Sequence, residues 1–123
     1  MKLRIHENSL RLRLNQADVA RLEQDGRVVE AVEFGPNARF TYSLESSGKC
    51  GNPRASYRDG SLKVEVPAES ARVWAASDQV AISGEQEGAD KPLSILIEKD
   101  FKCAHRDSEE DQDAYPNPLA TRA

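Results

Sequence analysis

The chain has 123 residues, of which 38% are hydrophobic and 31% are charged, and its net charge is −4. This length and composition predict one compact domain, or two small interlocked halves, with a modest core. No apolar run approaches the roughly 20 residues of a membrane-spanning helix, and the opening residues lack the apolar core of a signal peptide. Together with only two cysteines, these features favour a cytoplasmic protein with free thiols.

The charge is unevenly distributed along the chain. Residues 1–63 carry 11 Lys and Arg against 8 Asp and Glu, whereas residues 64–123 carry 6 against 13. Five of these acids lie between Asp107 and Asp113. We therefore expect residues 104–123, which are acidic and contain proline, to form a disordered tail on a more basic domain.

Alternation of apolar and polar residues predicts strands in the first half of the chain. Asn15 is expected to cap a helix, because Asp18 stands three positions later in a variant of the capping box, and Gly26 is expected to end that helix. The predicted elements, in chain order, are strands at residues 3–5 and 9–14, this helix, and strands at residues 28–34 and 40–44.

The second half repeats this order at an offset of 52 to 53 residues. The matching pieces are Ser9-Leu10-Arg11-Leu12-Arg13-Leu14 with Ser61-Leu62-Lys63-Val64-Glu65-Val66, Val28 with Val80, and Lys49-Cys50 with Lys102-Cys103. Such a repeat predicts two strand-strand-helix-strand-strand units. We expect one domain over residues 1–103, made of repeats 1–50 and 54–103, with Trp74 and Tyr57 in its core.

The run Asp59-Gly60-Ser61-Leu62-Lys63-Val64-Glu65-Val66-Pro67-Ala68-Glu69, followed by a short helix, Asp78 and a strand pair, resembles the swapped-hairpin barrel of the AbrB and MraZ transcription regulators. That resemblance implies a β-rich α+β fold in which two duplicated units interlock into a small pseudo-twofold barrel, and it implies DNA binding. Lys63 and Arg72 are the only cations in the part that matches the family's arginine-bearing strand.

The whole chain also resembles an uncharacterised family of small bacterial proteins. The shared segments are the opening Asn-Ser-Leu-Arg-Leu-Arg-Leu and the closing Glu-Lys-Asp-Phe-Lys-Cys. This second resemblance implies no activity.

The first predicted hairpin carries the clearest candidate site. If it turns at Glu7-Asn8, then Arg4 faces Arg11 and Lys2 faces Arg13 across the strand pair. Like charges in directly opposed positions destabilise a hairpin, so four cations on one face without an acid break a local rule. Such positions are where function is expected, and we predict an anion-binding or nucleic-acid-binding face.

The second predicted hairpin balances its charges, because Arg54 falls opposite Glu65. The basic face of the first hairpin has two interpretations. It is either a solvated surface whose long side chains extend into water, or a site for nucleic acid or an acidic protein surface. The acidic run from Asp107 to Asp113 is a candidate partner within the chain. A monomeric pseudo-dimer and a homodimer both remain open.

Other chemistry is weakly indicated. Cys103 and His105 are weak metal-ligand candidates, but a structural zinc site needs four ligands, so we expect no metal and no cofactor. Cys50 and Cys103 occupy equivalent repeat positions, which leaves a disulfide open. No phosphate-binding glycine loop and no nucleophile elbow occurs, so we do not expect an enzyme.

These patterns predict a non-catalytic binding module, with a regulatory DNA-binding protein as the leading interpretation. The alternatives are a protein-interaction module of unknown partner and a metal- or redox-responsive protein that uses Cys103 and His105. No membrane partner is expected.

Overall fold

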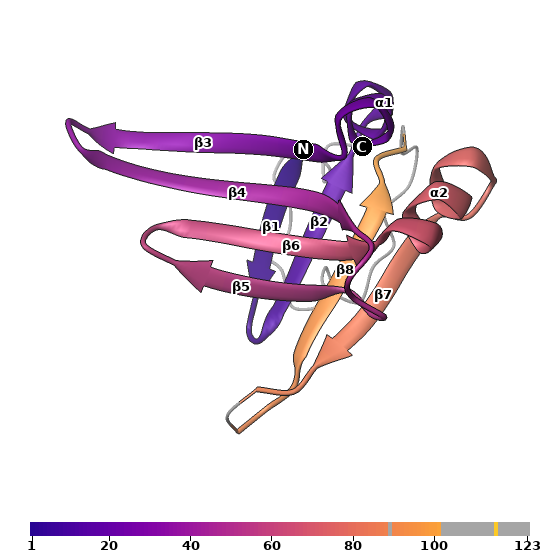
Figure 1. Cartoon of the computed structure of the whole chain (residues 1–123). Helices are drawn as coiled ribbons and strands as arrows, with labels where there is room; N and C mark the ends of the chain where they lie inside the picture. The colour runs from indigo at the N-terminus through magenta and orange to yellow at the C-terminus, as the bar shows by residue number, and fades with distance from the viewer. Residues whose placement is uncertain (89, 102–114, 116–123) are drawn as a thin grey trace, which may run out of the picture.

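The computed structural model describes residues 1–88, 90–101 and 115. The first half contains β1 (Lys2–His6), β2 (Ser9–Leu14), α1 (Gln16–Asp25), β3 (Arg27–Gly35) and β4 (Ala38–Ser47). The second half contains β5 (Arg54–Arg58), β6 (Ser61–Pro67), α2 (Ala68–Ala76), β7 (Ala81–Gln86) and β8 (Leu93–Lys99) (Figure 1). The predicted order of strand-strand-helix-strand-strand is therefore present twice. The predicted tail lies outside the described residues, apart from Tyr115.

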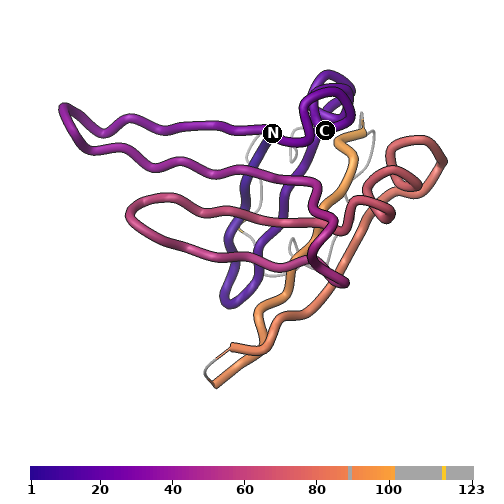
Figure 2. Tube along the Cα trace, in the orientation of Figure 1, coloured from indigo at the N-terminus to yellow at the C-terminus, as the bar shows by residue number. Residues whose placement is uncertain are grey.

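The two halves exchange hairpins to build two four-stranded sheets. The first sheet has the order β1-β2-β8-β7, and the second has the order β3-β4-β6-β5. Each sheet joins one hairpin from each half through a central parallel pair, β2 with β8 or β4 with β6. The strands of the second sheet run across those of the first, as the trace in Figure 2 shows.

The expected closed barrel is not formed. Each hairpin pairs with the hairpin of the other half along one side only, so β1 and β7 border the first sheet and β3 and β5 border the second. Two open sheets result, which have edge strands that a closed barrel would lack. The duplication predicted from the sequence is compatible with this arrangement.

The two central strand pairs have matching registers. Leu12 aligns with Ile97 in the first sheet, and the repeat-equivalent Val64 aligns with Leu44 in the second. The outer strands follow a different offset from the one that the sequence suggests. Val28 pairs with Leu44 as Ile82 pairs with Ile97, so the partner of Val28 in the repeat is Ile82 rather than Val80.

The helix α1 has both of its predicted end signals. The Asn15 side chain accepts a bond of 2.8 Å from the Asp18 N–H, and the Asp18 carboxylate accepts one of 3.1 Å from the Asn15 N–H. Gly26 ends the helix in the left-handed conformation, with φ 77°, where glycine has no steric penalty. In contrast, α2 follows Pro67 and has no side-chain cap.

The core lies between the inner faces of the two sheets and the two helices, which sit at one end of the sheets (Figure 1). Trp74 is fully buried, as predicted, and its Nε1–H donates to the Val80 carbonyl at 3.0 Å. The prediction for Tyr57 is wrong, because its side chain is 67% exposed. Tyr57 lies on the edge strand β5, beside the Asp59-Gly60 turn, at the margin of the second sheet.

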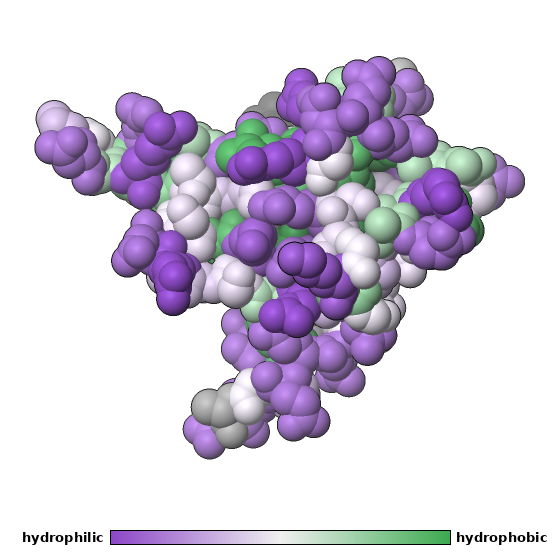
Figure 3. All heavy atoms as spheres, viewed as in Figure 1, coloured by the Kyte–Doolittle hydropathy of each residue, from purple (hydrophilic) through white to green (hydrophobic). Residues whose placement is uncertain are grey.

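The face of the second sheet that points away from the core is largely hydrophilic, as the space-filling view shows (Figure 3). Within the described part of the chain, no helix has the length and apolar character needed to cross a membrane.

Candidate anion-binding face

The predicted pairing of the four cations is confirmed. Lys2 pairs with Arg13 and Arg4 pairs with Arg11 in the β1–β2 hairpin. Alternate residues of β2 are buried in the core, and because strand side chains alternate between faces, all four cations project from the outer face of the first sheet. We call Lys2, Arg4, Arg11 and Arg13 the cationic block.

The hairpin alone suggested four cations without an acid, but two acids from another part of the chain lie beside the cationic block. The parallel strand β8 lies beside β2 and places Glu98 opposite Arg13. The Arg13 Nε donates to Glu98 Oε1 at 2.7 Å, and the Arg11 Nε lies 3.7 Å from the same oxygen. Lys2 Nζ lies 3.1 Å from Asp100 Oδ2. These acids are 85 or more positions away in the sequence, beyond the reach of hairpin reasoning.

The equivalent row of the second sheet has a different charge order. There Arg54 pairs with Glu65, Glu65 with Glu45, and Glu45 with Arg27. Each acid therefore has a cation on its outer side, and the Arg54 Nε lies 3.9 Å from Glu65 Oε1. Clustering of cations distinguishes the first sheet, because Arg13 stands where the second sheet has Glu65.

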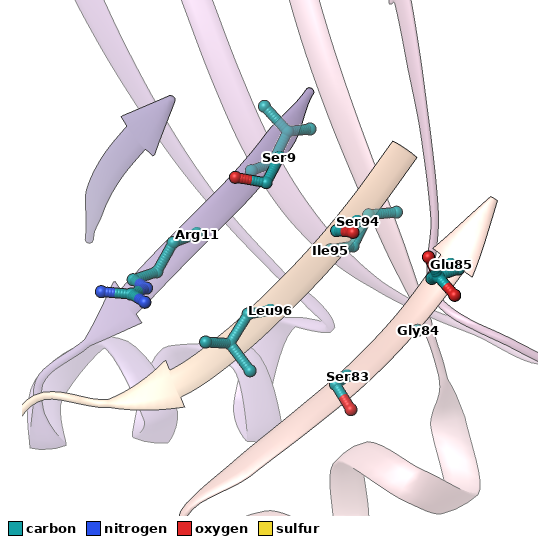
Figure 4. A pocket seen from close by; sticks show the side chains of 9 residues that line it. Ser9, Arg11, Ser83, Gly84, Glu85, Ser94, Ile95 and Leu96 are labelled. Carbon is teal, nitrogen blue, oxygen red and sulfur yellow. The ribbon is translucent and has the colours of Figure 1, made fainter. Parts of the chain in front are cut away.

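A shallow hollow of about 530 Å³ extends the cationic block across the same face. It follows two rows of paired residues over β2, β8 and β7. These rows are Arg11–Leu96–Ser83 and Ser9–Ser94–Glu85. Figure 4 shows these side chains on the three neighbouring strands. These two rows supply one guanidinium, three hydroxyls, one carboxylate and the apolar Leu96, and Leu10, Gly84 and Ile95 complete the lining. The polar groups suit a polar extended ligand better than a small apolar one.

A second charged cluster lies at the start of β1, and sequence reasoning missed it. The Met1 ammonium lies 2.8 Å from Asp18 Oδ2 and 2.9 Å from Glu30 Oε2, and the Tyr42 hydroxyl donates to the Met1 carbonyl at 3.1 Å. Asp18 was identified only as a helix-capping residue. Its second role requires β1 to lie beside α1 and β3, which no local pattern predicts.

The Met1 ammonium and the Tyr42 hydroxyl at this cluster have raised pKa values. Burial lowers the pKa of the Met1 ammonium, but the hydrogen bonds and charges of Asp18 and Glu30 outweigh burial and raise it above its ordinary value of 8.0. Burial, and then the charges of Glu30 and Asp18, raise the pKa of Tyr42 above 10.0. The first effect stabilises a cation and the second a neutral phenol, as expected beside two carboxylates.

The weak metal candidates Cys103 and His105 lie outside the described residues. The disulfide between Cys50 and Cys103 that the repeat left open therefore involves a residue outside them as well. Cys50 itself is a half-buried free thiol in the loop between β4 and β5. Among the described residues no group of three or more His, Cys, Asp and Glu is placed to hold a metal ion.

The fold and this face define a β-rich protein of two four-stranded sheets, whose halves exchange hairpins and whose first sheet carries a cationic block. The sequence matches the family of unknown function DUF7009 over residues 1–119, so the chain belongs to that family. No curated protein and no solved structure matches the chain.

Proposed function

We propose that this protein is a non-catalytic binding module that holds an anionic partner against the outer face of its first sheet. One observation carries the proposal: the register of the β1–β2 hairpin, which places Arg4 directly opposite Arg11 and Lys2 opposite Arg13. Clustered like charges cost stability in a strand pair, and an anionic partner offsets that cost when it binds.

The chemistry of the face favours an acidic polypeptide as that partner. Glu98 and Glu85 interrupt the cations within two strands of the cationic block, so the positive charge does not continue across the whole face as a phosphate backbone would require. An acidic segment needs only a few well-placed cations, and the serines of the hollow offer hydroxyl donors beside them. DNA is the partner that the resemblance to AbrB and MraZ regulators implies, and it is the second outcome of the test.

The test compares two pairs of repeat-equivalent cations. Lys2 and Arg11 of the first sheet correspond to Arg54 and Lys63 of the second. We expect the double variant Lys2→Ala/Arg11→Ala to weaken binding to polyglutamate at low salt by about tenfold or more, because two charge-assisted contacts are lost. The double variant Arg54→Ala/Lys63→Ala removes the same charge and should bind as the unchanged protein does. Equal losses in the two variants would show a diffuse charge effect and contradict the proposal.

Duplex DNA of mixed sequence, titrated across a salt series, separates the two partners. Weak binding that is unchanged by Lys2→Ala/Arg11→Ala supports an acidic polypeptide. An affinity for DNA that falls steeply with salt, and that releases about two fewer ions in that variant, would identify DNA instead.

The acidic run from Asp107 to Asp113 bears on the same proposal through its sequence alone, since it lies outside the described residues. If it competes for the cationic block, deleting residues 107–123 raises the affinity for polyglutamate at low salt. Identical affinities with and without those residues would remove the competition from the account.

A further inference from the structure

The edge strand β5 is closed by a side chain. The Ala55 N–H donates to Gln86 Oε1 at 2.6 Å, and Gln86 Nε2 donates to the Ala55 carbonyl at 2.9 Å. One carboxamide thus makes both hydrogen bonds that a neighbouring strand would make at this residue. Capping of this kind protects an exposed strand edge from pairing with another chain.

The repeat-equivalent edge, β1, lacks this cap. Leu3 pairs with Leu12 as Ala55 pairs with Val64, so Leu3 presents its backbone N–H and carbonyl to the edge of the first sheet as Ala55 does in the second. Val32 pairs with Phe40 as Gln86 pairs with Leu93. Valine has no hydrogen-bonding group, and no other side chain of the described residues caps Leu3.

An apolar surface overhangs this open edge. Met1 contacts Glu30 and the Tyr42 hydroxyl, so these two residues mark where β1 meets the β3–β4 hairpin. The hairpin continues beyond them, past β1, to its tip (Figure 1). On that extension lie Val32, which is 42% exposed, and Phe34, which is 72% exposed. Alternation puts Val32 on the core-facing side together with its partner Phe40, whereas Phe34 lies in the bulge between Glu33 and Gly35, near the tip.

We propose that β1 and the overhang of Val32 and Phe40 form a groove that accepts an extended segment of a partner protein as an added strand. Such additions draw affinity from main-chain hydrogen bonds and specificity from alternate side chains. The groove lies at the margin of the sheet that carries the cationic block, so a bound strand would continue that sheet.

The alternation of β1 defines the chemistry of the partner. Lys2, Arg4 and His6 project to the outer face, whereas Leu3 and Ile5 project to the inner face. The complementary segment alternates acidic residues, which lie beside the cations, with apolar residues, which cover Ile5 and the overhang. The acidic part of this statement rests on the proposed function, and the apolar part does not.

A second copy of the chain fits the groove less well. Pairing of two β1 strands would bring Lys2 and Arg4 of one copy against the same cations of the other, and like charges in opposed positions destabilise a strand pair. We therefore assign the groove to a partner segment that is acidic on one side.

The experiment uses the full chain and a fluorescent peptide of about seven residues that alternates glutamate with valine, a length suited to one strand. Binding is followed by anisotropy, and amide exchange of Leu3 and Ile5 is followed by NMR. We expect the bound peptide to slow exchange at both amides. Val32→Gln, which copies the cap of the second sheet, should weaken binding by about tenfold or more. Phe40→Ala should weaken it through loss of the apolar overhang.

The matched control is Gln86→Val, which opens the β5 edge and should leave peptide binding at β1 unchanged. A peptide with serine in place of glutamate separates the two proposals. If it binds and Val32→Gln abolishes its binding, the groove stands even where polyglutamate fails to bind the cationic block. Peptide binding that Val32→Gln and Phe40→Ala both leave unchanged would overturn the groove.

Two further outcomes would reassign the occupant and overturn the proposal. One is a dimer in sedimentation experiments that Val32→Gln dissociates, which would make the occupant a second copy. The other is a peptide that binds only after residues 104–123 are removed, which would make the occupant a segment of this chain.

Discussion

The two edges that the repeat makes equivalent, β5 and β1, differ in whether a side chain caps them. Gln86 caps β5 by bonding both backbone groups of Ala55, and the repeat equivalent of Gln86 is Val32, which has no hydrogen-bonding group. The scaffold therefore protects one of these two edges with a side chain. Because unprotected edges are a pairing hazard, an open edge beside exposed apolar residues indicates a surface retained for a partner.

The cationic block shows the same divergence between equivalent positions. Arg13 stands where the second sheet has the acid Glu65. On the neighbouring strand both sheets have an acid at the equivalent position, Glu98 in the first sheet and Glu45 in the second. Both changes lie on the first sheet. The fold thus contains two similar sheets, and the first differs from the second in its uncapped edge and its clustered cations.

The largest expected effect is on stability, and it compares the equivalent buried side chains of the two helices. Trp74 is fully buried and bonded to the Val80 carbonyl, and its equivalent in α1 is the smaller Leu22, which is 3% exposed. We expect Trp74→Ala to lower the free energy of unfolding by roughly 3–5 kcal/mol. Leu22→Ala should cost less, because it leaves a smaller cavity and no unpaired carbonyl. Chemical denaturation measures both, and a larger cost for Leu22→Ala would contradict the greater contribution assigned to Trp74.

The next effect concerns the cap itself. Gln86→Val removes two hydrogen bonds from a half-buried edge, and we expect a loss of about 1–2 kcal/mol in the free energy of unfolding. Val32→Gln adds the same group to the other edge and should leave stability unchanged or slightly increased. Thermal unfolding of the two variants checks this prediction, and destabilisation by both would show that the two edges are not equivalent.

A third effect distinguishes the two helices. Asn15→Ala removes the capping box of α1 and should cost about 1 kcal/mol. The helix α2 has no side-chain cap to lose, since Pro67 precedes it. Ala68→Ser, at the first residue of α2, is the control and should be close to neutral. Equal shifts of the denaturation midpoint in the two variants would contradict the claim that only α1 depends on a side-chain cap.

The smallest expected effect is a dependence on pH. The Met1 ammonium has a pKa raised above 8.0, so its contribution to stability is complete below pH 8 and is lost as the pH rises through its folded value. The pKa of Tyr42 is raised above 10.0, which adds a further loss at pH values above 10. Stability should therefore fall as the solution becomes alkaline.

The variant Asp18→Asn removes one carboxylate from this cluster and should flatten that alkaline decline. Asn15→Ala disrupts the same helix end without removing the charge, so it should leave the slope as it is. Unfolding curves collected from pH 7 to 10 distinguish the two, and parallel slopes for all three proteins would contradict the role given to the Met1 cluster.

Local signals predicted local structure well. The Glu7-Asn8 turn fixed the pairing of Lys2 with Arg13, and Asn15 and Gly26 marked the two ends of α1. The repeat predicted the order of the elements because each unit has its own turns. The single incorrect alignment, Val28 with Val80, arose because the spacing between helix and strand differs between the halves.

Features that depend on distant pairing were not predicted. The contact of Glu98 with Arg13 and the open sheets in place of a barrel both follow from β2 lying beside β8, a pairing with no signal inside either strand. Tyr57 has the apolar neighbours of a core residue, yet its exposure depends on where the other sheet ends. The importance of Gln86 appears only when its equivalent, Val32, is identified.

The most direct test is the hydrogen exchange of two amides in the free, full-length protein. We predict that the Ala55 amide, bonded to Gln86, exchanges at least about tenfold more slowly than the Leu3 amide, and that Gln86→Val removes the difference. Equal protection of Leu3 and Ala55 in the unchanged protein would show that the β1 edge is closed, and it would contradict the account of an open first sheet.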